Sequence, residues 1–248
     1  MDVEKTWVSA WLIYKSNLKS ILLIVLIIYI PILIVRLVFP YEQIYNDFGY
    51  SIYEITKYLL QISGNLIGVI GFISFVIITE SSAHGIEITL RNVLLKACSR
   101  WWAFIKSTFL SGIIIFLYTL LLIIPGIIKS IQFVFVGYAA SIRDVSGKKA
   151  LEYSKSVTEG QRWRIFGFFL LLWLLSIGPA IAYFYLIYIT DNDKLIVNSA
   201  LVINYFISPF FTILYGVLFL DLEKQWENKG NFKKDDLLNP SEHSLASP

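Results

Sequence analysis

Long apolar runs constrain this chain more than any other feature of its sequence. A helix needs about 20 apolar residues to cross the hydrocarbon core of a bilayer, and runs of this kind recur along the chain. Because 56% of the residues are hydrophobic and only 16% are charged, little sequence remains for a separate soluble core. We predict an all-α, multi-pass membrane protein whose six transmembrane helices form three hairpins. The predicted spans are residues 18–39, 58–79, 103–124, 127–142, 165–189 and 195–220.

The fourth of these spans, residues 127–142, is short for a helix that crosses a bilayer. It follows Pro125-Gly126, which we expect to turn the chain back into a hairpin with the third span. At about 1.5 Å per residue it falls short of a hydrocarbon core of about 30 Å. The sequence therefore leaves open whether this hairpin spans fully, or is tilted, locally thins the bilayer or is shielded by its neighbours.

Lys and Arg residues gather at the ends of alternate spans. Among the 21 residues of these two types, Arg36, Lys57, Lys129 and Lys194 are the exceptions. Cytoplasmic segments of membrane proteins carry an excess of Lys and Arg. The pattern places both termini in the cytoplasm and the chain in a bacterial cytoplasmic (inner) membrane. We assign residues 1–220 to the membrane domain and expect residues 221–248 to be a largely disordered cytoplasmic tail.

Two polar segments that precede spans have the periodicity of amphipathic helices. Residues 1–17 place Trp7 and Trp11 on one face, and residues 80–102 combine an apolar stripe with a cationic face. Such helices lie at the level of the lipid headgroups. Cations here and in residues 143–164 are candidates for contact with anionic headgroups or with a membrane-protein partner, or they serve only to set topology. These candidates are Arg91, Lys96, Arg100, Lys148, Lys149, Lys155, Arg162 and Arg164.

A weak internal repeat accompanies these segments. Leu90 and Trp102 are separated by the same interval as Leu151 and Trp163, and each pair lies on a basic segment that precedes an apolar hairpin. One interpretation is a set of parallel repeats, each an interfacial helix followed by a hairpin. The other is that all junctions between basic and apolar sequence look alike. The sequence leaves both open.

A group of small, polar and aromatic residues follows the third span. Its members are Pro125, Gly126, Asp144, Gly147, Ala150, Leu151, Ser154, Gly160 and Trp163. In this order they resemble the bacterial membrane domain that accompanies glycerophosphoryl diester phosphodiesterases, and related multi-span proteins of unassigned role. The family often has glutamate where this chain has Asp144. The resemblance implies that Pro125-Gly126 turns the hairpin, that Trp163 marks the interfacial entry of the fifth span, and that the protein is associated with lipid-headgroup metabolism.

Residues that carry enzyme chemistry are absent from the predicted spans. An ionisable group inside a bilayer marks a functional site by default, yet no Asp or Glu lies at mid-depth in any span. The sequence has no HExxH or GxSxG motif, and Cys98 is its one cysteine. We therefore expect no enzyme activity, no cofactor and no metal site. We also expect no nucleic-acid partner, because the basic residues are held at a bilayer.

Two interpretations of the function remain. We favour a non-enzymatic membrane module in membrane organisation or a lipid-linked process, with membrane lipids as its partners. The alternative is a transporter or lipid translocator with a polar site at mid-membrane. Polar residues within the spans favour this alternative, although such residues also form hydrogen bonds between helices. They are Asn65, Ser130, Gln132, Asn198 and Asn204.

Overall fold

The computed structural model describes residues 3–189 and 193–228, and every regular element in these ranges is a helix. In chain order the elements are α1 (Val3–Ser16), α2 (Leu18–Ile24), the π-helical turn η1 (Val25–Tyr29), α3 (Ile30–Val38), α4 (Tyr41–Ala83), α5 (Leu90–Leu121), α6 (Ile123–Gln132), α7 (Val136–Ile142), α8 (Lys148–Thr158), α9 (Arg162–Ile189) and α10 (Asp193–Asn228). Because α10 continues to Asn228, it includes the first residues of the predicted tail. The rest of that tail lies outside the described residues.

Six helical stretches are long and apolar enough to cross a membrane, which confirms the prediction of an all-helical, multi-pass membrane protein at this level. The stretches are Leu18–Val38, Gln43–Ala83, Leu90–Leu121, Ile123–Ile142, Arg162–Pro179 and Ile203–Asn228. Several extend beyond the apolar runs of the sequence. Thus α4 also contains the tyrosine-rich segment before the second predicted span, with a kink at Gly49, where a φ of 81° favours glycine.

The first stretch packs antiparallel against α4. Pro31 has no N–H to donate to the preceding turn, and the π-helical turn η1 lies directly before it. Tyr29, the last residue of η1, donates its hydroxyl hydrogen to the carbonyl oxygen of Gly68 at 3.0 Å. A Cβ at Gly71 would lie only 2.5 Å from the same hydroxyl oxygen. The glycines of α4 therefore make room for an aromatic ring between the two helices.

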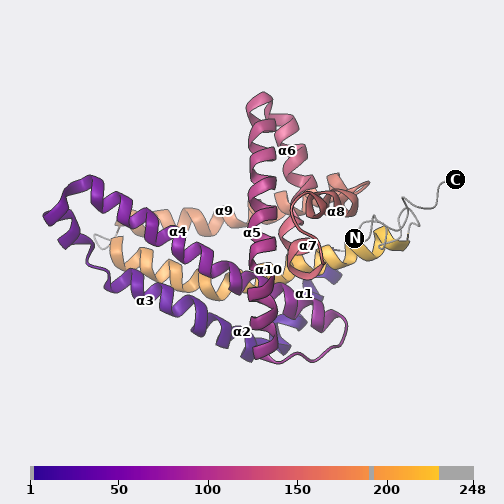
Figure 1. Cartoon of the computed structure of the whole chain (residues 1–248), viewed down its shortest axis with the longest axis horizontal. Helices are drawn as coiled ribbons and strands as arrows, with labels where there is room; N and C mark the ends of the chain where they lie inside the picture. The colour runs from indigo at the N-terminus through magenta and orange to yellow at the C-terminus, as the bar shows by residue number, and fades with distance from the viewer. Residues whose placement is uncertain (1–2, 190–192, 229–248) are drawn as a thin grey trace.

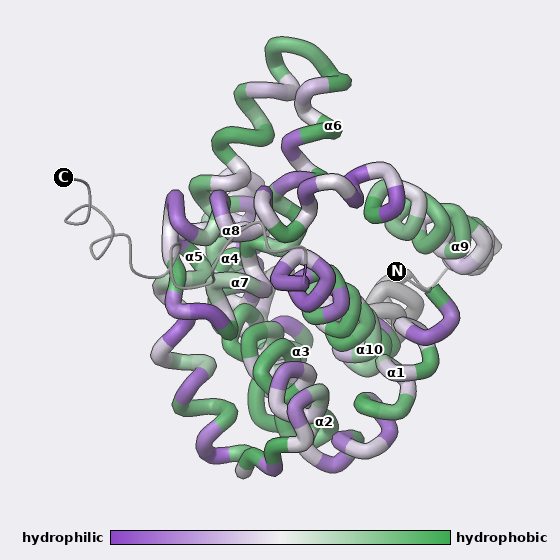
Figure 2. Tube along the Cα trace, turned by 90° about the vertical axis from the view of Figure 1, so that its right-hand side faces the viewer, coloured by the Kyte–Doolittle hydropathy of each residue, from purple (hydrophilic) through white to green (hydrophobic). Residues whose placement is uncertain are grey.

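The α5–α6 pair stands crosswise to the other long helices. In Figure 1, α3, α4, α9 and α10 follow the long axis of the molecule, whereas α5 and α6 run across it. The view in Figure 2, turned by 90°, agrees, because α5 and α6 keep their direction while α10 is seen nearly end-on. A hydropathy pattern indicates how long and how apolar a helix is, but not the direction in which it runs. The crosswise course of the third and fourth predicted spans could therefore not be predicted from the sequence.

The turn between α5 and α6 differs from the predicted one. Leu122 is extended, with φ −159° and ψ 140°, and breaks the helix. Pro125 and Gly126 lie inside the first turns of α6, where the missing N–H of proline is tolerated because the first N–H groups have no intrahelical partner. A Cβ at Gly126 would lie 2.9 Å from the backbone of Thr119. Gly126 is thus needed for the close approach of the two helices, not for the turn.

The protein core lies where α4, α7 and α10 meet. Phe75, Phe135 and Phe219 each have at most 1% of their surface exposed. In contrast, the tip of the α5–α6 pair, residues 120–124, consists of leucine and isoleucine side chains that are 67% to 75% exposed, seen in green at the top of Figure 2. An apolar tip of this size requires lipid or another protein to cover it.

Candidate functional site

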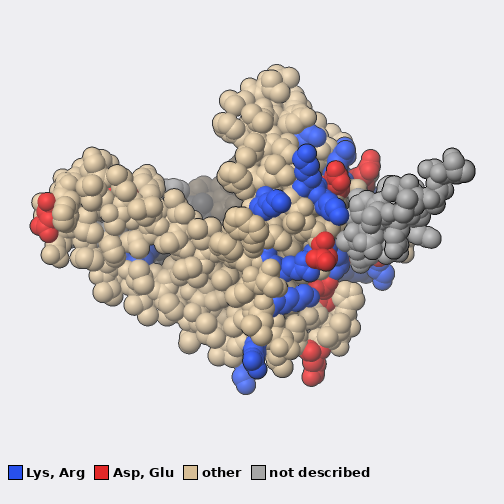
Figure 3. Space-filling model, in the orientation of Figure 1, with Lys and Arg blue, Asp and Glu red and all other residues tan. Residues whose placement is uncertain are grey.

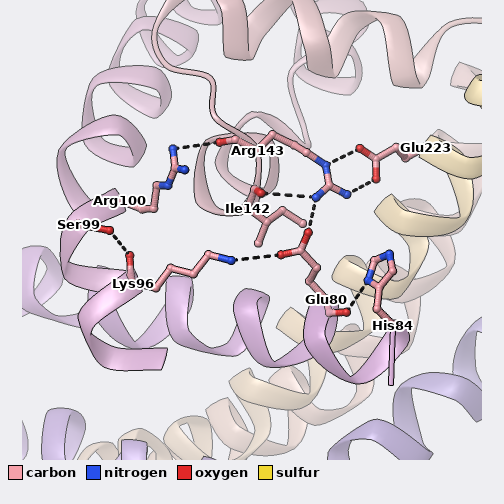
Figure 4. Close-up of polar contacts among 8 residues, drawn as sticks. All are labelled: Glu80, His84, Lys96, Ser99, Arg100, Ile142, Arg143 and Glu223. Carbon is pink, nitrogen blue, oxygen red and sulfur yellow. Dashed lines mark hydrogen bonds and ion pairs between the residues drawn. The ribbon is translucent and has the colours of Figure 1, made fainter. Parts of the chain in front are cut away.

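Arg143 lies at the centre of a buried ion network (Figure 4). It directly follows α7, and its side chain is 10% exposed. Its Nε and Nη2 donate to the two carboxylate oxygens of Glu223, at 2.7 and 2.5 Å, and its Nη1 donates to Glu80. Such bidentate pairs are among the strongest hydrogen-bonded contacts in proteins. One guanidinium group therefore joins the ends of α4, α7 and α10.

Tyr153 of α8 completes the surroundings of Glu223. It is fully buried, donates its hydroxyl hydrogen to the Glu223 carboxylate and packs its ring against Phe219 and Trp226. Burial raises the pKa of Tyr153, and the charge of Glu223 raises it further. Burial alone would lower the pKa of Arg143, but the hydrogen bonds and charge of Glu223 more than offset this effect and raise it. Tyr153 thus stays a neutral donor and Arg143 a cation.

Two cations of α5 extend the network. Lys96 Nζ lies 3.7 Å from Oε2 of Glu80. Arg100 Nη1 donates to Oδ1 of Asp144 at 2.6 Å and to the backbone carbonyl oxygen of Arg143 at 3.3 Å. The network therefore pairs Lys96, Arg100 and Arg143 with three carboxylates and is neutral as a whole. Because buried charge is tolerated only where it is paired, we interpret the network as a structural connection between helices.

Two residues of potentially reactive type, His84 and Cys98, are close in sequence to members of the network. The His84 ring lies 2.8 Å from a backbone carbonyl oxygen, that of Glu80, and Cys98 is exposed on α5. Within residues 3–189 and 193–228, no group of three or more His, Cys, Asp and Glu side chains is placed to hold a metal ion. Among the described residues the geometry thus supplies no metal centre, and the Tyr153 hydroxyl beside the Glu223 carboxylate is buried.

Ser154 connects α8 to a break in the predicted fourth span. That span is two helices, because α6 ends at Gln132 and α7 begins at Val136. The Ser154 hydroxyl donates to the carbonyl oxygen of Gln132 at 2.8 Å and accepts the N–H of Phe135 at 3.2 Å. The hydroxyl therefore satisfies backbone groups that the break leaves without helical partners. No feature of the sequence pattern distinguished this role of Ser154.

The other residues of the motif lie around the same helix. Gly147 precedes α8 with a φ of 56°, and its N–H donates to the Ser107 hydroxyl at 2.8 Å. Ala150 and Leu151 are buried on the inner side of α8, and Gly160 follows the helix with a φ of 76°. Trp163 opens α9 and is 86% exposed. Gly147, Ala150, Leu151 and Ser154 are thus buried at the start and on the inner side of α8, while Trp163 lies on the surface.

The eight candidate lipid-contact cations fall into different environments. Lys96 and Arg100 belong to the ion network, and Arg162 is partly buried, with an Nε that has no hydrogen-bond partner among the described residues. The remaining five are exposed, and we call them the cationic face: Arg91, Lys148, Lys149, Lys155 and Arg164. Figure 3 shows that, on this face, Lys and Arg side chains are concentrated in the right-hand half of the view, from α5 toward α8.

A cleft of about 1740 Å³ opens between α3, α4 and α10. Among the polar residues predicted at mid-membrane, it brings together Asn65 and Asn204. Ser130 instead donates to the carbonyl oxygen of Ile127, and Gln132 is buried beside Ser154. The side chain of Asn198 lies outside the described residues. The cleft is thus a second candidate site, separate from the ion network.

Comparison with known proteins identifies no relative of this chain. No protein-family model matches it, and neither does any curated protein or solved structure. The resemblance to the membrane domain of glycerophosphoryl diester phosphodiesterases stays a hypothesis.

Sequence reasoning missed the ion network, although part of its signal was present. Glu80 and Arg143 are each the first charged residue beyond a predicted span, a position where a charge faces either the headgroups or a partner. Glu223 was assigned to the tail, and Tyr153 was not singled out. Their pairing could not be predicted without the fold, because Arg143 and Glu223 are 80 positions apart in the chain.

Proposed function

We propose that this protein is a non-enzymatic membrane module that gathers anionic lipid at its cationic face, in membrane organisation or another lipid-linked process. The supporting observation is the exposure of the five cations of this face together with Trp102 and Trp163, which are 67% and 86% exposed. Among the described residues, none of these cations forms an ion pair. Near an anionic leaflet each such cation contributes about 1 kcal/mol, and tryptophan prefers the membrane interface.

The crosswise pair suggests how the chain is threaded. We infer that α2–α3, α4, α9 and α10, which share a direction, cross the bilayer as two hairpins. The α5–α6 pair then lies along the membrane surface, with its apolar tip at the boundary of the acyl chains. This threading keeps both termini and the cationic face in the cytoplasm of a bacterium. It also moves Lys129 to that side, which leaves Arg36, Lys57 and Lys194 on the other.

Amphipathic helices at the cytoplasmic surface belong to the same proposal. In α8, one side is buried against the protein, while Lys148, Lys149 and Lys155 are exposed on the other. That arrangement suits a helix whose outer side meets headgroups. Membership of the family that the motif resembles is proposed on the same ground, because Gly147, Ala150, Leu151 and Ser154 hold this helix in place.

Charge removal from the cationic face tests the proposal. The protein, extracted in mild detergent with phosphatidylglycerol and phosphatidylcholine, is weighed by native mass spectrometry to count the lipids retained. The tested variant combines Lys148→Gln, Lys149→Gln, Lys155→Gln and Arg164→Gln. We expect it to retain several-fold less phosphatidylglycerol, because each lost cation removes about 1 kcal/mol of attraction. The charge-preserving variant with Lys148→Arg, Lys149→Arg and Lys155→Arg should retain as much as the wild type, and equal retention by the Gln variant would leave these residues a role in topology only.

Lipid translocation is the second candidate function. The observation that favours it is the presence of Asn65 and Asn204 in one cleft, because polar groups at mid-depth can form a substrate site. Saturable movement of a labelled phospholipid across vesicles that contain the purified protein would favour translocation over the module.

A further inference from the structure

We propose that the cleft between α3, α4 and α10 binds one anionic diacyl phospholipid, with its phosphate at Arg36 and Lys57 and its acyl chains directed toward Phe72. The inference deepens the lipid-linked function proposed above but uses a different surface. Both residue types that it requires, cations and apolar side chains, are found in the walls of the cleft.

Charge complementarity favours an anion at one end of the cleft. Among the described residues that line it, Arg36 and Lys57 are the charged ones, and both are cations. Lys57 is paired with Glu54 at 3.3 Å and lies over the Tyr53 ring. Arg36 is exposed and forms no ion pair with a described residue. A guanidinium group in this state matches a phosphate, which it binds through two parallel hydrogen bonds.

Polarity changes along the cleft in the way that an amphiphile requires. Because Ile32 approaches Gly64 and Tyr29 bonds to Gly68, Arg36 lies near the level of Gln61. The lining around this level contains most of the polar residues of the cleft, beside apolar ones such as Val35, Leu37 and Leu60, whereas the other end is mostly apolar. The polar residues include Gln43, Asn46, Tyr50, Tyr53 and Gln61, and the apolar ones include Ile27, Ile28, Ile67, Val69, Phe72 and Phe104.

The length of the apolar part matches an acyl chain. From Gln61 to Phe72, α4 advances by about 16 Å at about 1.5 Å per residue. One leaflet contributes about half of a hydrocarbon core of about 30 Å. A chain whose headgroup lies at Arg36 therefore ends near Phe72. A volume of about 1740 Å³ also exceeds the roughly 300–1,000 Å³ of pockets for small ligands.

Two amides lie between the polar and the apolar ends. Asn65 and Asn204 line the cleft, and neither side chain has a hydrogen-bond partner among the described residues. A polar group in an apolar environment is destabilising unless it is hydrogen-bonded. The ester carbonyl oxygens of a diacyl phospholipid are acceptors for the two amide N–H groups. Two amides that donate to two ester carbonyl groups thus favour a phospholipid with two acyl chains.

The cleft draws its lipid from the leaflet opposite the cationic face. Lys57 and Glu80 mark the two ends of the long part of α4 and are separated by about 34 Å at about 1.5 Å per residue. That separation exceeds the thickness of the hydrocarbon core, about 30 Å. Since Glu80 belongs to the ion network and Lys57 to the cleft, the two lipid sites are at opposite surfaces. Loss of one does not entail loss of the other.

Native mass spectrometry of the full chain also tests this site. The probe is 1-palmitoyl-2-oleoyl-phosphatidylglycerol, with phosphatidylcholine of the same chains as the neutral comparison, and the readout is the single lipid that persists at the highest collision energy. We expect one phosphatidylglycerol in the wild type. Arg36→Gln should weaken its retention about tenfold, since a hydrogen bond to a charged group contributes that order of affinity. Arg91→Gln removes a cation of the other surface and should leave the persistent lipid in place.

A steric variant tests the site independently of charge. Asn204→Trp fills the cleft and should abolish the persistent lipid. Its control is Ile203→Trp, because Ile203 is 56% exposed and lies outside the lining. Size-exclusion profiles equal to that of the wild type verify folding. Equal persistence of phosphatidylcholine, or an unchanged persistent lipid in either Arg36→Gln or Asn204→Trp, would overturn the proposal, whereas the proposed function fails only if the variant of the cationic face retains its full number of lipids.

Discussion

A guanidinium group that is one-tenth exposed must find its counter-ions within the protein, and Arg143 finds them at the ends of α4 and α10. Desolvation of such a pair opposes much of its Coulomb attraction, so the pair is weak evidence for stability. Breaking it is different, because Arg143 then keeps only Glu80, and its Nε and Nη2 groups are left buried without an acceptor. The consequence for this chain is that Glu223, at 5% exposure, matters for folding although it lies in a segment predicted as tail.

Removal of the Glu223 carboxylate tests this role at the scale of one residue. We expect Glu223→Leu to lower the free energy of unfolding by about 3–5 kcal/mol, because Arg143 loses its bidentate partner. Replacing both partners, with Arg143→Met and Glu223→Leu, should recover part of the loss, because no guanidinium donor is left unpaired and Glu80 keeps Lys96 as its counter-ion. Asp144→Asn breaks an exposed pair, since Asp144 is 88% exposed, and should change stability by less than about 1 kcal/mol. Unfolding by SDS titration in mixed micelles measures all three, and a Glu223→Leu variant as stable as Asp144→Asn would contradict the assignment.

At the scale of helices, two glycines of the α5–α6 pair offer a matched comparison. A Cβ at Gly126 would lie 2.9 Å from the backbone of Thr119, whereas a Cβ at Gly112 meets nothing within 4 Å. We expect Gly126→Ala to separate α5 from α6 and to lower the unfolding free energy by about 1–3 kcal/mol. Gly112→Ala should raise it by up to about 1 kcal/mol, because alanine is the better helix former. The same SDS titration distinguishes the two, and equal effects would show that α5 and α6 are not in close contact.

Some features of these helices could be predicted from the sequence, and others could not. The six apolar stretches were predictable, because length and composition are local properties. The position of the α5–α6 turn was predicted at Pro125-Gly126, but it depends on Leu122, whose type carries no turn preference. The partners of Arg143 and the meeting of Asn65 with Asn204 depend on contacts between distant segments. Contacts of this kind produce no periodic residue pattern, so they could not be predicted from a single sequence.

At the scale of the whole molecule, the direction of α5 decides between two threadings. Six parallel spans place Arg91 and Leu121, near opposite ends of α5, at opposite membrane surfaces. If α5 lies along the surface, as its crosswise course in Figures 1 and 2 favours, both residues are shallow. Residues at the centre of α9, such as Leu174, are deep in either threading.

Depth measurements on spin-labelled protein in vesicles separate these threadings. In a Cys98→Ser background, Arg91→Cys, Leu121→Cys and Leu174→Cys each introduce one labelling site, and collisions with oxygen and with a water-soluble nickel chelate report depth. We expect Leu174→Cys to be deepest, and Leu121→Cys to match Arg91→Cys within a few ångströms on the cytoplasmic side. A chelate confined to the outside of right-side-out vesicles should reach neither of these two. If it reaches Leu121→Cys but not Arg91→Cys, α5 spans the bilayer and all six stretches cross it. The crosswise pair would then have to turn against the other helices on insertion, breaking the contacts through which Arg100 and Ser107 hold Asp144 and Gly147.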